Sequence, residues 1–391
     1  MRSCGRWAAG IAAAALGLAV VTACAPSSRR RTDTTPSANA PRATFGVVSA
    51  TFISPRTGWA LGVRRCHQAG CPRLALRTTS DGGRHWLAVP APPSAWIYQR
   101  PCCPSRAAAV SSIRFADRRN GWAFGPGLWA THDGGRTWHQ VTTHGWPVEG
   151  LAAADGRVVA VFTRGRRFRV WSSPESADRW RPVPSASGAG FQPSLALAAG
   201  TGYLAVSHQP NRAGQPAPTS VLLTGPANGS ASWRQLVLPC PAWTLTSLAA
   251  AAAGSLAVAC AGQPGAGSQR KQAYLSPDHG RTWHRLTSPP GSGYLEQISI
   301  SRADTIVLSG SRSDVYISWD HGRTWHGAAS TTPSLNPAYQ AGEALTATMT
   351  TSSQGLIVAP DTPYPTPPQL NVGKIWLTHD DGHAWQLITI R

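Results

Sequence analysis

The chain alternates apolar and small polar residues in short runs that are separated by tight turns. Residues 108–115 alternate in this way, and residues 121–125, 128–131 and 137–141 form three further apolar runs. Alternation with a period of two residues over runs this short predicts β-strands. Polar and glycine-rich segments between the runs predict tight turns, so each set of four runs is expected to form an antiparallel meander. Residues 45–90 repeat the same arrangement.

An eight-residue motif recurs between the third and fourth run of these units. It contains Ser or Thr, an Asp two positions later, a Gly two positions after the Asp and a Trp three positions after the Gly. Degenerate copies cover residues 173–180 and 224–233. The Trp residues of successive copies are roughly 40 to 60 positions apart, which is typical of repeat architectures. The Asp and Trp residues of the five complete copies are Asp81 and Trp86, Asp133 and Trp138, Asp278 and Trp283, Asp320 and Trp325, and Asp380 and Trp385.

Each position of the motif has a structural explanation. The Asp carboxylate can accept hydrogen bonds from backbone N–H groups of the turn, and the Gly permits a positive φ. The Trp provides a large apolar surface that can fill the space between neighbouring units. We therefore expect the motif to determine architecture rather than chemistry.

The repeated motif resembles the Asp-box, or BNR, repeat of sialidases and of many non-enzymatic propellers. The pairs Gly58-Trp59 and Gly121-Trp122 resemble those of photosystem II assembly factor propellers, a family of assembly and binding scaffolds. The resemblance covers residues 45–391 and implies an all-β, seven-bladed β-propeller of four-stranded antiparallel blades. Six or eight blades are also compatible, because the two degenerate copies are adjacent. The expected blades are 45–90, 106–143, 147–185, 191–238, 241–288, 293–329 and 338–391.

The resemblance to sialidases does not extend to catalytic residues. Sialidases of this type carry an arginine in a Phe/Tyr-Arg-Ile-Pro segment before the first box, whereas this chain has Phe52-Ile-Ser-Pro55. Glycoside hydrolysis needs two spaced carboxyl groups, and the chain has only 17 acidic residues, several of them in box turns. No other catalytic motif is present. We expect no catalytic residues and no cofactor, with a sialidase-like glycosidase as an alternative.

The histidines follow the repeats. Radial repetition is expected to spread them around the rim, so we predict no metal site. They lie inside the boxes or directly after a box Trp: His85, His132, His279, His321, His379, His139 and His284.

The connections between blades contain the candidate ligand-binding residues. Each connection carries an aromatic residue, and three of the four Glu residues of the chain follow such an aromatic closely. Because loops of all blades meet near the central channel, we expect an aromatic-lined mouth with carboxylates that suits a sugar, a cationic group or a peptide segment. Packing of the aromatics at the blade ends is the alternative. The residues are Trp96, Tyr98, Trp146, Glu149, Phe191, Trp243, Tyr294, Glu296, Tyr339 and Glu343.

The beginning of the chain resembles a bacterial lipoprotein signal. Residues 1–23 combine Arg2 and Arg6 with an apolar run that is too short to span a membrane, and Val21-Thr-Ala-Cys24 resembles a lipobox. We expect lipidation of Cys24, a flexible tether over residues 24–44 and attachment to the extracytoplasmic face of the cell membrane. An ordinary secretory signal is the alternative.

The chain has six cysteines besides Cys4 of the signal segment and Cys24, and their number agrees with an exported protein. An even number of cysteines in an oxidising compartment indicates disulfides. We favour the pairs Cys66–Cys71 and Cys240–Cys260. The adjacent Cys102 and Cys103 seldom pair with each other and remain unassigned.

The net charge of +19 comes mostly from scattered arginines and indicates mainly a solvated surface. It also suits anionic headgroups or wall polymers, and nucleic acid is not an expected partner outside the cell. Together these features predict a monomeric, non-catalytic envelope lipoprotein that binds a protein partner. Binding of a carbohydrate or cell-wall polymer is the alternative.

Overall fold

The computed structural model describes residues 45–64, 73–93, 95–97, 108–207, 220–240, 245–262, 265–291, 293–301, 305–335, 345–359 and 373–390. For Trp96 and Phe191 it describes the backbone alone. Several predicted features lie outside the described residues: the signal segment, Cys24 and the tether, the pair Cys66–Cys71, Cys102 and Cys103, and the site candidates Tyr98, Trp243, Tyr339 and Glu343.

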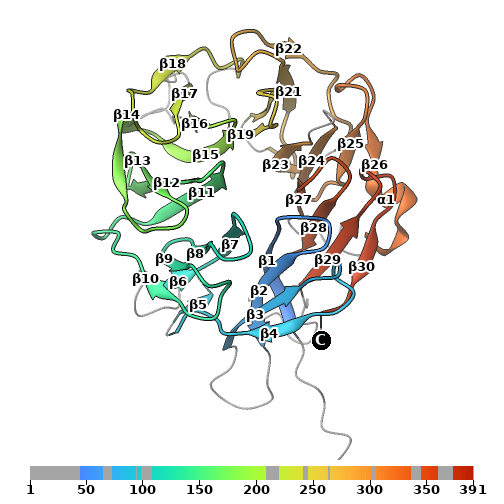
Figure 1. Ribbon diagram of the computed structural model, residues 1–391. Helices are drawn as coiled ribbons and strands as arrows, with labels where there is room; N and C mark the ends of the chain where they lie inside the picture. Colours follow the sequence, from blue (N-terminus) through green and yellow to red (C-terminus); the bar gives the residue numbers. More distant parts are fainter. Residues whose placement is uncertain are drawn as a thin grey trace, which may run out of the picture. The chain divides into compact units, whose positions relative to one another are not determined.

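The described chain forms seven four-stranded antiparallel sheets that surround a central opening (Figure 1). Each sheet is a meander of four consecutive strands, with the first strand innermost. The prediction of a seven-bladed, all-β propeller is therefore confirmed. Blade 1 contains β1 (Phe45–Phe52), β2 (Gly58–Arg64), β3 (Arg73–Thr79) and β4 (Leu87–Val89); blade 2 contains β7 (Ser112–Phe115), β8 (Gly121–Phe124), β9 (Leu128–Thr131) and β10 (His139–Gln140); blade 3 contains β11 (Val148–Ala154), β12 (Arg157–Arg164), β13 (Arg167–Pro174) and β14 (Arg181–Ala189); blade 4 contains β15 (Phe191–Ala198), β16 (Thr201–Ser207), β17 (Val221–Pro226) and β18 (Arg234–Leu236); blade 5 contains β19 (Leu245–Ala250), β20 (Leu256–Ala261), β21 (Lys271–Ser276) and β22 (His284–Arg285); blade 6 contains β23 (Tyr294–Ile300), β24 (Ile306–Ser311), β25 (Tyr316–Ser318) and β26 (His326–Gly327); blade 7 contains β27 (Thr346–Met349), β28 (Gly355–Ala359), β29 (Lys374–Thr378) and β30 (Gln386–Ile388).

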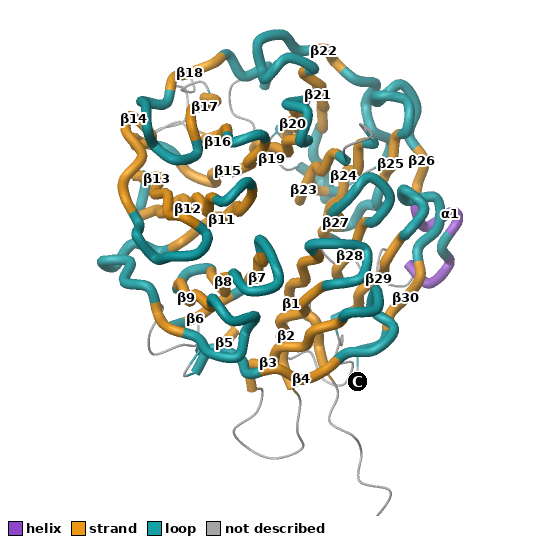
Figure 2. Tube along the Cα trace, viewed as in Figure 1, coloured by secondary structure: helices purple, strands orange, loops and turns teal. Residues whose placement is uncertain are grey.

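Two short strands and two short helices lie outside the blades. A parallel pair of short strands, β5 (Trp96–Ile97) and β6 (Ala109–Val110), brackets the connection from blade 1 to blade 2. Between blades 6 and 7 lie the short helices α1 (Ala328–Thr331) and η1 (Pro333–Leu335), which stand out from the strands and loops in Figure 2. Among the described residues, no helix has the length and apolar character needed to cross a membrane.

The core consists of seven hydrophobic clusters, one at each interface between neighbouring blades. The ring is closed by one of these clusters, in which Phe45 and Phe52 of blade 1 pack with Leu356, Ile375 and Leu377 of blade 7. No strand is shared between the described parts of blades 1 and 7, so side-chain packing closes the ring. The Trp of each motif copy contributes to one cluster: Trp86, Trp138, Trp180, Trp233, Trp283, Trp325 and Trp385.

Serine hydroxyls connect the innermost strands of neighbouring blades. This explains the small polar residues that interrupt the apolar pattern of the first strands, because each hydroxyl accepts a hydrogen bond from a backbone N–H group that would otherwise lack a partner. The pairs are Ser49 with Ile113, Ser194 with Leu248, Ser247 with Ile298, and Ser299 with Met349.

The Asp-box turn of blade 2 shows how the motif folds. Asp133 Oδ1 accepts hydrogen bonds from the backbone N–H groups of Arg136 and Thr137, both at 2.9 Å, and Oδ2 accepts one from the Thr137 hydroxyl at 2.6 Å. The Thr131 hydroxyl donates to Asp133 Oδ1 and accepts from the Gly135 N–H group. These hydrogen bonds, first that from the Thr137 hydroxyl, lower the pKa of Asp133 to about 2. The Asp133 carboxylate thus accepts its hydrogen bonds from residues of its own turn.

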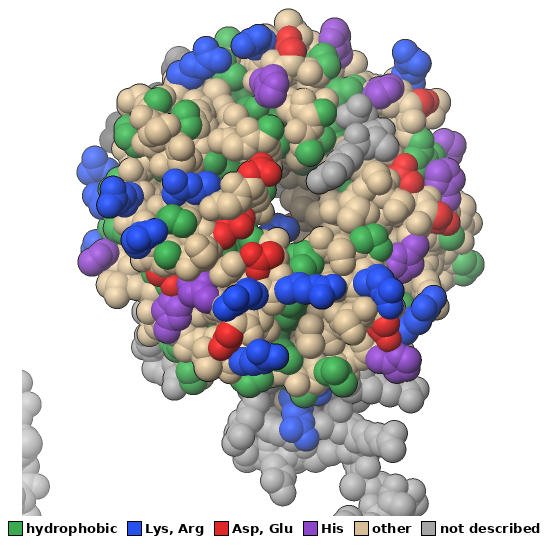
Figure 3. Space-filling model, in the orientation of Figure 1, with side chains coloured by type: hydrophobic (Ala, Val, Ile, Leu, Met, Phe, Trp, Pro, Cys, Tyr) green, Lys and Arg blue, Asp and Glu red, His purple; other side chains and the backbone are tan. Residues whose placement is uncertain are grey.

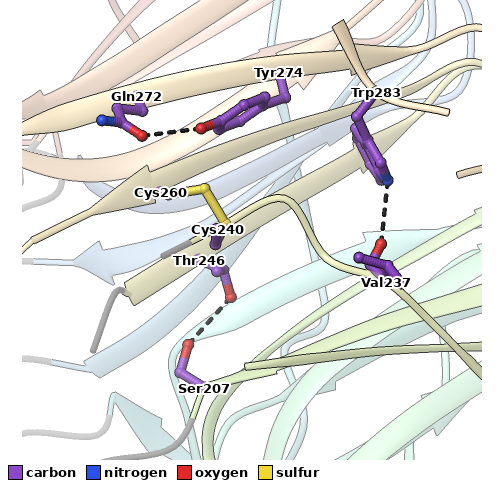
Figure 4. The surroundings of a disulfide bond; sticks show 8 residues. All are labelled: Ser207, Val237, Cys240, Thr246, Cys260, Gln272, Tyr274 and Trp283. Carbon is purple, nitrogen blue, oxygen red and sulfur yellow. Dashed lines mark hydrogen bonds between the residues drawn. A yellow bond between two sulfur atoms is a disulfide. The ribbon is translucent and has the colours of Figure 1, made fainter. Parts of the chain in front are cut away.

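A disulfide joins Cys240 to Cys260, as predicted, with a Cα–Cα distance of 5.5 Å (Figure 4). Cys240 belongs to the connection that precedes β19, and Cys260 lies in β20. Nearby, the Ser207 and Thr246 hydroxyls are hydrogen-bonded at 3.1 Å between blades 4 and 5. The disulfide therefore fixes the connection between these blades beside a polar contact of the same interface.

Candidate functional site

The antiparallel meander gives the propeller two chemically different faces. The first strand begins, the second ends and the third begins on one face, where the chain passes from blade to blade; we call this the connection face. The turns between first and second strands and the Asp-boxes lie on the opposite face, which we call the box face. Because this arrangement repeats in every blade, a residue's place in its strand determines the face on which it lies.

Trp146 and Glu149 lie on the connection face of blade 3. The guanidinium carbon of Arg169, at the beginning of β13, lies 4.1 Å from the centre of the Trp146 ring, which is a cation–π contact. Glu149 is exposed, and its Oε2 accepts a hydrogen bond of 3.2 Å from the hydroxyl of Thr163 near the end of β12. The connection before β11, the strand β11 and the strand β13 thus bring an indole, a carboxylate and a guanidinium, respectively, to the same face.

Tyr294 and Glu296 lie at the corresponding place in blade 6. Both belong to the beginning of β23, and Tyr294 pairs with Ser311 of β24. Part of the Glu296 side chain is exposed, yet the protein atoms around its carboxyl group raise its pKa, an effect that a hydrogen bond from Ser311 opposes. The surrounding protein therefore favours the neutral form of the Glu296 carboxyl group more than water would.

Glu149 and Glu296 occupy equivalent irregularities of the innermost strands. In β11 the pairing register shifts between Val148 and Gly150, and in β23 it shifts between Leu295 and Gln297. Each Glu is the residue at that β-bulge. A bulge takes a residue out of the ladder and redirects its side chain, which is why bulges are frequent beside binding sites. The same irregularity therefore presents a carboxylate at two places beside the opening.

Basic residues lie on the same connection face as these carboxylates. The turn between β12 and β13 is exposed and includes Arg164 and Arg167, next to Arg169. Guanidinium groups can bind carboxylates through two parallel hydrogen bonds. Further basic residues lie at the turns between second and third strands of other blades: Arg64, Arg270, Arg312 and Lys374.

Four of the ten predicted ligand-binding residues are thus placed with their side chains, two in blade 3 and two in blade 6. Trp96 lies in β5 and Phe191 begins β15, with only the backbone described. Thr163 and Arg169 also belong to the candidate site and were not predicted from the sequence. The signal that could have identified them is strand register, because Val148 pairs with Phe162, next to Thr163.

The box face carries acidic groups near the opening together with exposed arginines of the Asp-box turns, such as Arg136 and Arg281. Burial, followed by the charges of Asp117 and Asp155, raises the pKa of Glu175 to about 7. Figure 3 shows acidic side chains beside the central opening and histidines towards the rim. Asp117 and Asp155 are used in local structure, since Asp117 accepts backbone hydrogen bonds in its own turn and Asp155 accepts one from Gly200 of blade 4.

Comparison with solved structures identifies propellers of the same fold. A structure described as YCF48 bound to D1 peptide is 17% identical with a TM-score of 0.55, and the match covers 87% of this chain and 94% of that chain. YCF48 from Cyanidioschyzon merolae is 13% identical with a TM-score of 0.53, and the match covers 88% of this chain and 98% of that chain. At these identities the likeness shows the fold alone.

Other comparisons add no family assignment. The GH74 enzyme of Niastella koreensis is 11% identical over 88% of this chain and 71% of that chain, and its TM-score of 0.31 supports no argument about activity. No protein-family model matches the chain, and no curated protein matches it significantly.

Proposed function

We propose that the propeller is a non-catalytic scaffold that binds a peptide segment of a protein partner on its connection face. The observation that carries this proposal is the pair of equivalent β-bulges that place Glu149 and Glu296 beside the channel opening, each close in sequence to an aromatic residue. The exposed arginines of the β12–β13 turn extend the same surface.

The groups on this face match the chemistry of a polypeptide. Glutamate carboxylates can accept hydrogen bonds from peptide N–H groups, and arginines can bind acidic side chains or a terminal carboxylate. Trp146 and Tyr294 provide rigid apolar surface with little loss of conformational entropy, a property of residues that dominate binding energy in interfaces. A segment that crosses the opening from blade 3 to blade 6 would contact both Glu residues.

The similarity to YCF48 supports this proposal at the level of the fold. That protein has been solved with a D1 peptide bound, so a propeller of this kind can bind a segment of another protein. Function depends on the site rather than on the fold, so the residues of the connection face define the proposed surface here.

The proposal includes attachment to the extracytoplasmic face of the cell membrane through a lipid on Cys24. The lipobox-like segment that ends at Cys24 and the polar tether over residues 24–44 support it. Metabolic labelling with an alkyne fatty acid is expected to label the wild-type protein and not Cys24→Ala. Equal labelling of both would contradict the anchor.

The binding surface can be tested by capture of partners from intact cells. The double variant Trp146→Ala/Glu296→Gln removes one group from each side of the surface. A matched control, Asp155→Asn/His284→Ala, changes two residues of the box face. After chemical crosslinking and affinity purification, we expect the partner captured by the wild type and the control to be lost from the double variant.

Two outcomes would contradict the proposal. Capture of the same protein partners by the double variant would show that the connection face is not the binding surface. Saturable binding to a wall polysaccharide or other glycan that the same double variant abolishes, with no captured protein, would assign the surface to carbohydrate instead. Circular dichroism of both variants provides the check on folding.

A further inference from the structure

Two histidines and one aspartate converge at the rim between blades 2 and 3. His132 Nε2 lies 2.9 Å from Asp178 Oδ2, and His139 Nε2 contacts the same oxygen. The three ligand atoms lie within 4.8 Å of one another, and the imidazole ring centres are 5.7 Å apart. The expectation that radial repetition spreads the histidines around the rim therefore does not hold for these two. They meet because both belong to blade 2, where His132 directly follows β9 and His139 begins the adjacent strand β10. Asp178 reaches both from the neighbouring blade 3.

The hydrogen bonds around His132 leave its Nε2 available as a ligand. His132 Nδ1 lies 2.7 Å from Asn120 Oδ1, and Asn120 Nδ2 donates at 2.7 Å to Asp117 Oδ2. With its amide nitrogen engaged by Asp117, Asn120 presents an oxygen that can only accept, so Nδ1 of His132 carries the proton. In a neutral imidazole, Nε2 then has the lone pair. Metal-binding histidines are typically oriented in this way by a partner on the other ring nitrogen.

Asp178 is oriented in a comparable way. Its Oδ1 accepts a hydrogen bond of 3.3 Å from the Trp180 indole, which leaves Oδ2 for the two histidines. The side chains of His132 and Asp178 are 29% and 19% exposed, so both are partly shielded, whereas His139 is 53% exposed. The protein thus partly covers His132 and Asp178, whereas His139 faces the solvent.

The degenerate motif of blade 3 explains why Asp178 is available. In blade 2 the box Asp133 is saturated by its own turn, as described above. In blade 3 the motif has Glu175 at the box position, and Asp178 stands three residues further on. Its carboxylate faces His132 and His139 across the blade interface instead of closing its own turn.

We infer that His132 Nε2, His139 Nε2 and Asp178 Oδ2 form a binding site for a divalent transition-metal ion, with zinc as the best match. Zinc binds imidazole nitrogen and carboxylate oxygen at about 2.0–2.2 Å and prefers tetrahedral coordination, so water or a partner's side chain would supply the fourth ligand. Both contacts of Asp178 Oδ2 would have to widen to admit an ion, and His139 is the most exposed of the three side chains. The ion would link blades 2 and 3.

A matched control exists within the chain. His284 follows the box Trp283 of blade 5 as His139 follows Trp138 of blade 2. In the part of the chain that the structure describes, no carboxylate pairs with His284, which is exposed. His284→Ala therefore removes a histidine of the same type and position without changing the proposed site.

The test uses the purified full chain, produced with a tag that contains no histidine and stripped of metal with EDTA. Isothermal titration with zinc chloride is expected to show one saturable site in the wild type and in His284→Ala. His139→Ala and Asp178→Asn are expected to lower the affinity at least about 100-fold, because each removes one of three ligands, and even the loss of a residue that only orients a ligand costs about 10- to 100-fold. Cobalt should give the intense visible absorption of a tetrahedral site, absent in both variants.

Three results would overturn the inference. The first is the absence of saturable zinc binding in the wild type, which would leave the cluster as an ion-paired contact. The second is an affinity in His139→Ala and Asp178→Asn equal to that of the wild type. The third is an equal loss in His284→Ala. Zinc should also raise the melting temperature of the wild type and not that of Asp178→Asn, since a ligand that binds only the folded state stabilises it.

Discussion

Trp138 offers the clearest test of how the repeated motif stabilises the propeller. Its side chain is only 9% exposed and belongs to the cluster between blades 1 and 2. The indole lies edge-on to Phe115, with ring centres 6.3 Å apart, and its N–H group donates to the carbonyl oxygen of Pro90 at 3.0 Å. Trp138→Ala removes all three contributions from one blade interface.

The expected loss can be worked out from burial. A tryptophan side chain buries about 150–250 Å², which at about 25 cal/mol per Å² corresponds to roughly 4–6 kcal/mol as an upper estimate. Large-to-small substitutions of buried Trp cost about 3–5 kcal/mol. The hydrogen bond to Pro90 accounts for about 1 kcal/mol of this. We therefore expect Trp138→Ala to lower the free energy of unfolding by about 3–5 kcal/mol and Trp138→Phe to lower it by clearly less.

Urea unfolding followed by far-ultraviolet circular dichroism measures this loss as a shift of the midpoint at constant slope. Leu87→Ala serves as the control, because Leu87 is 67% exposed and its truncation should change stability by less than about 0.5 kcal/mol. If Trp138→Ala and Leu87→Ala had the same midpoint, the box Trp would not hold the blades together and the reasoning would be wrong.

Three further perturbations probe other parts of the structure. Replacing Cys240 and Cys260 with Ala opens a loop with a sequence separation of 20 and should lower the free energy of unfolding by about 3 kcal/mol in the same urea assay. A change below about 0.5 kcal/mol would argue against a stabilising bond. Gly322→Ala places a Cβ 2.6 Å from Leu286 at a φ of +78°, whereas Gly156→Ala meets open space at a φ of +77°, so the first should be more destabilising by about 1–3 kcal/mol in the same assay; equal effects would contradict the clash. Glu175 has a folded-state pKa raised to about 7, so wild-type stability should fall as pH rises from about 4.5 to 7, and Glu175→Gln should abolish that decline in urea titrations at several pH values; parallel profiles of both proteins would refute the assignment.

The repeating part of the structure could be predicted from the sequence because its causes are local. The strands of blades 1 and 2 follow the alternation of apolar residues, and the five complete motifs mark the turns between third and fourth strands. Gly83, at a φ of +89°, shows the constraint behind the motif, since a Cβ there would lie 2.8 Å from Leu377 of blade 7. The Trp86 side chain of the same motif fills space in this interface between blades 7 and 1.

The sites were harder to predict because they depend on contacts between segments that are distant in the sequence. The β-bulges at Glu149 and Glu296 are visible only once the strand register is known. The pairing of Asp178 with His132, 46 residues away, requires knowing that degenerate and complete motifs of neighbouring blades lie side by side. The displacement of the Asp in the degenerate copy was the available signal, because a box Asp that leaves its position no longer closes its turn.

Selective binding through one face can be tested most directly by site-specific photocrosslinking in living cells. A photoreactive amino acid is introduced at Arg164, exposed on the connection face, or at Arg281, exposed in an Asp-box turn of the box face. We expect a covalent product with a protein partner from position 164 and none from position 281. A product from position 281 alone, or equal products from both positions, would contradict binding through the connection face.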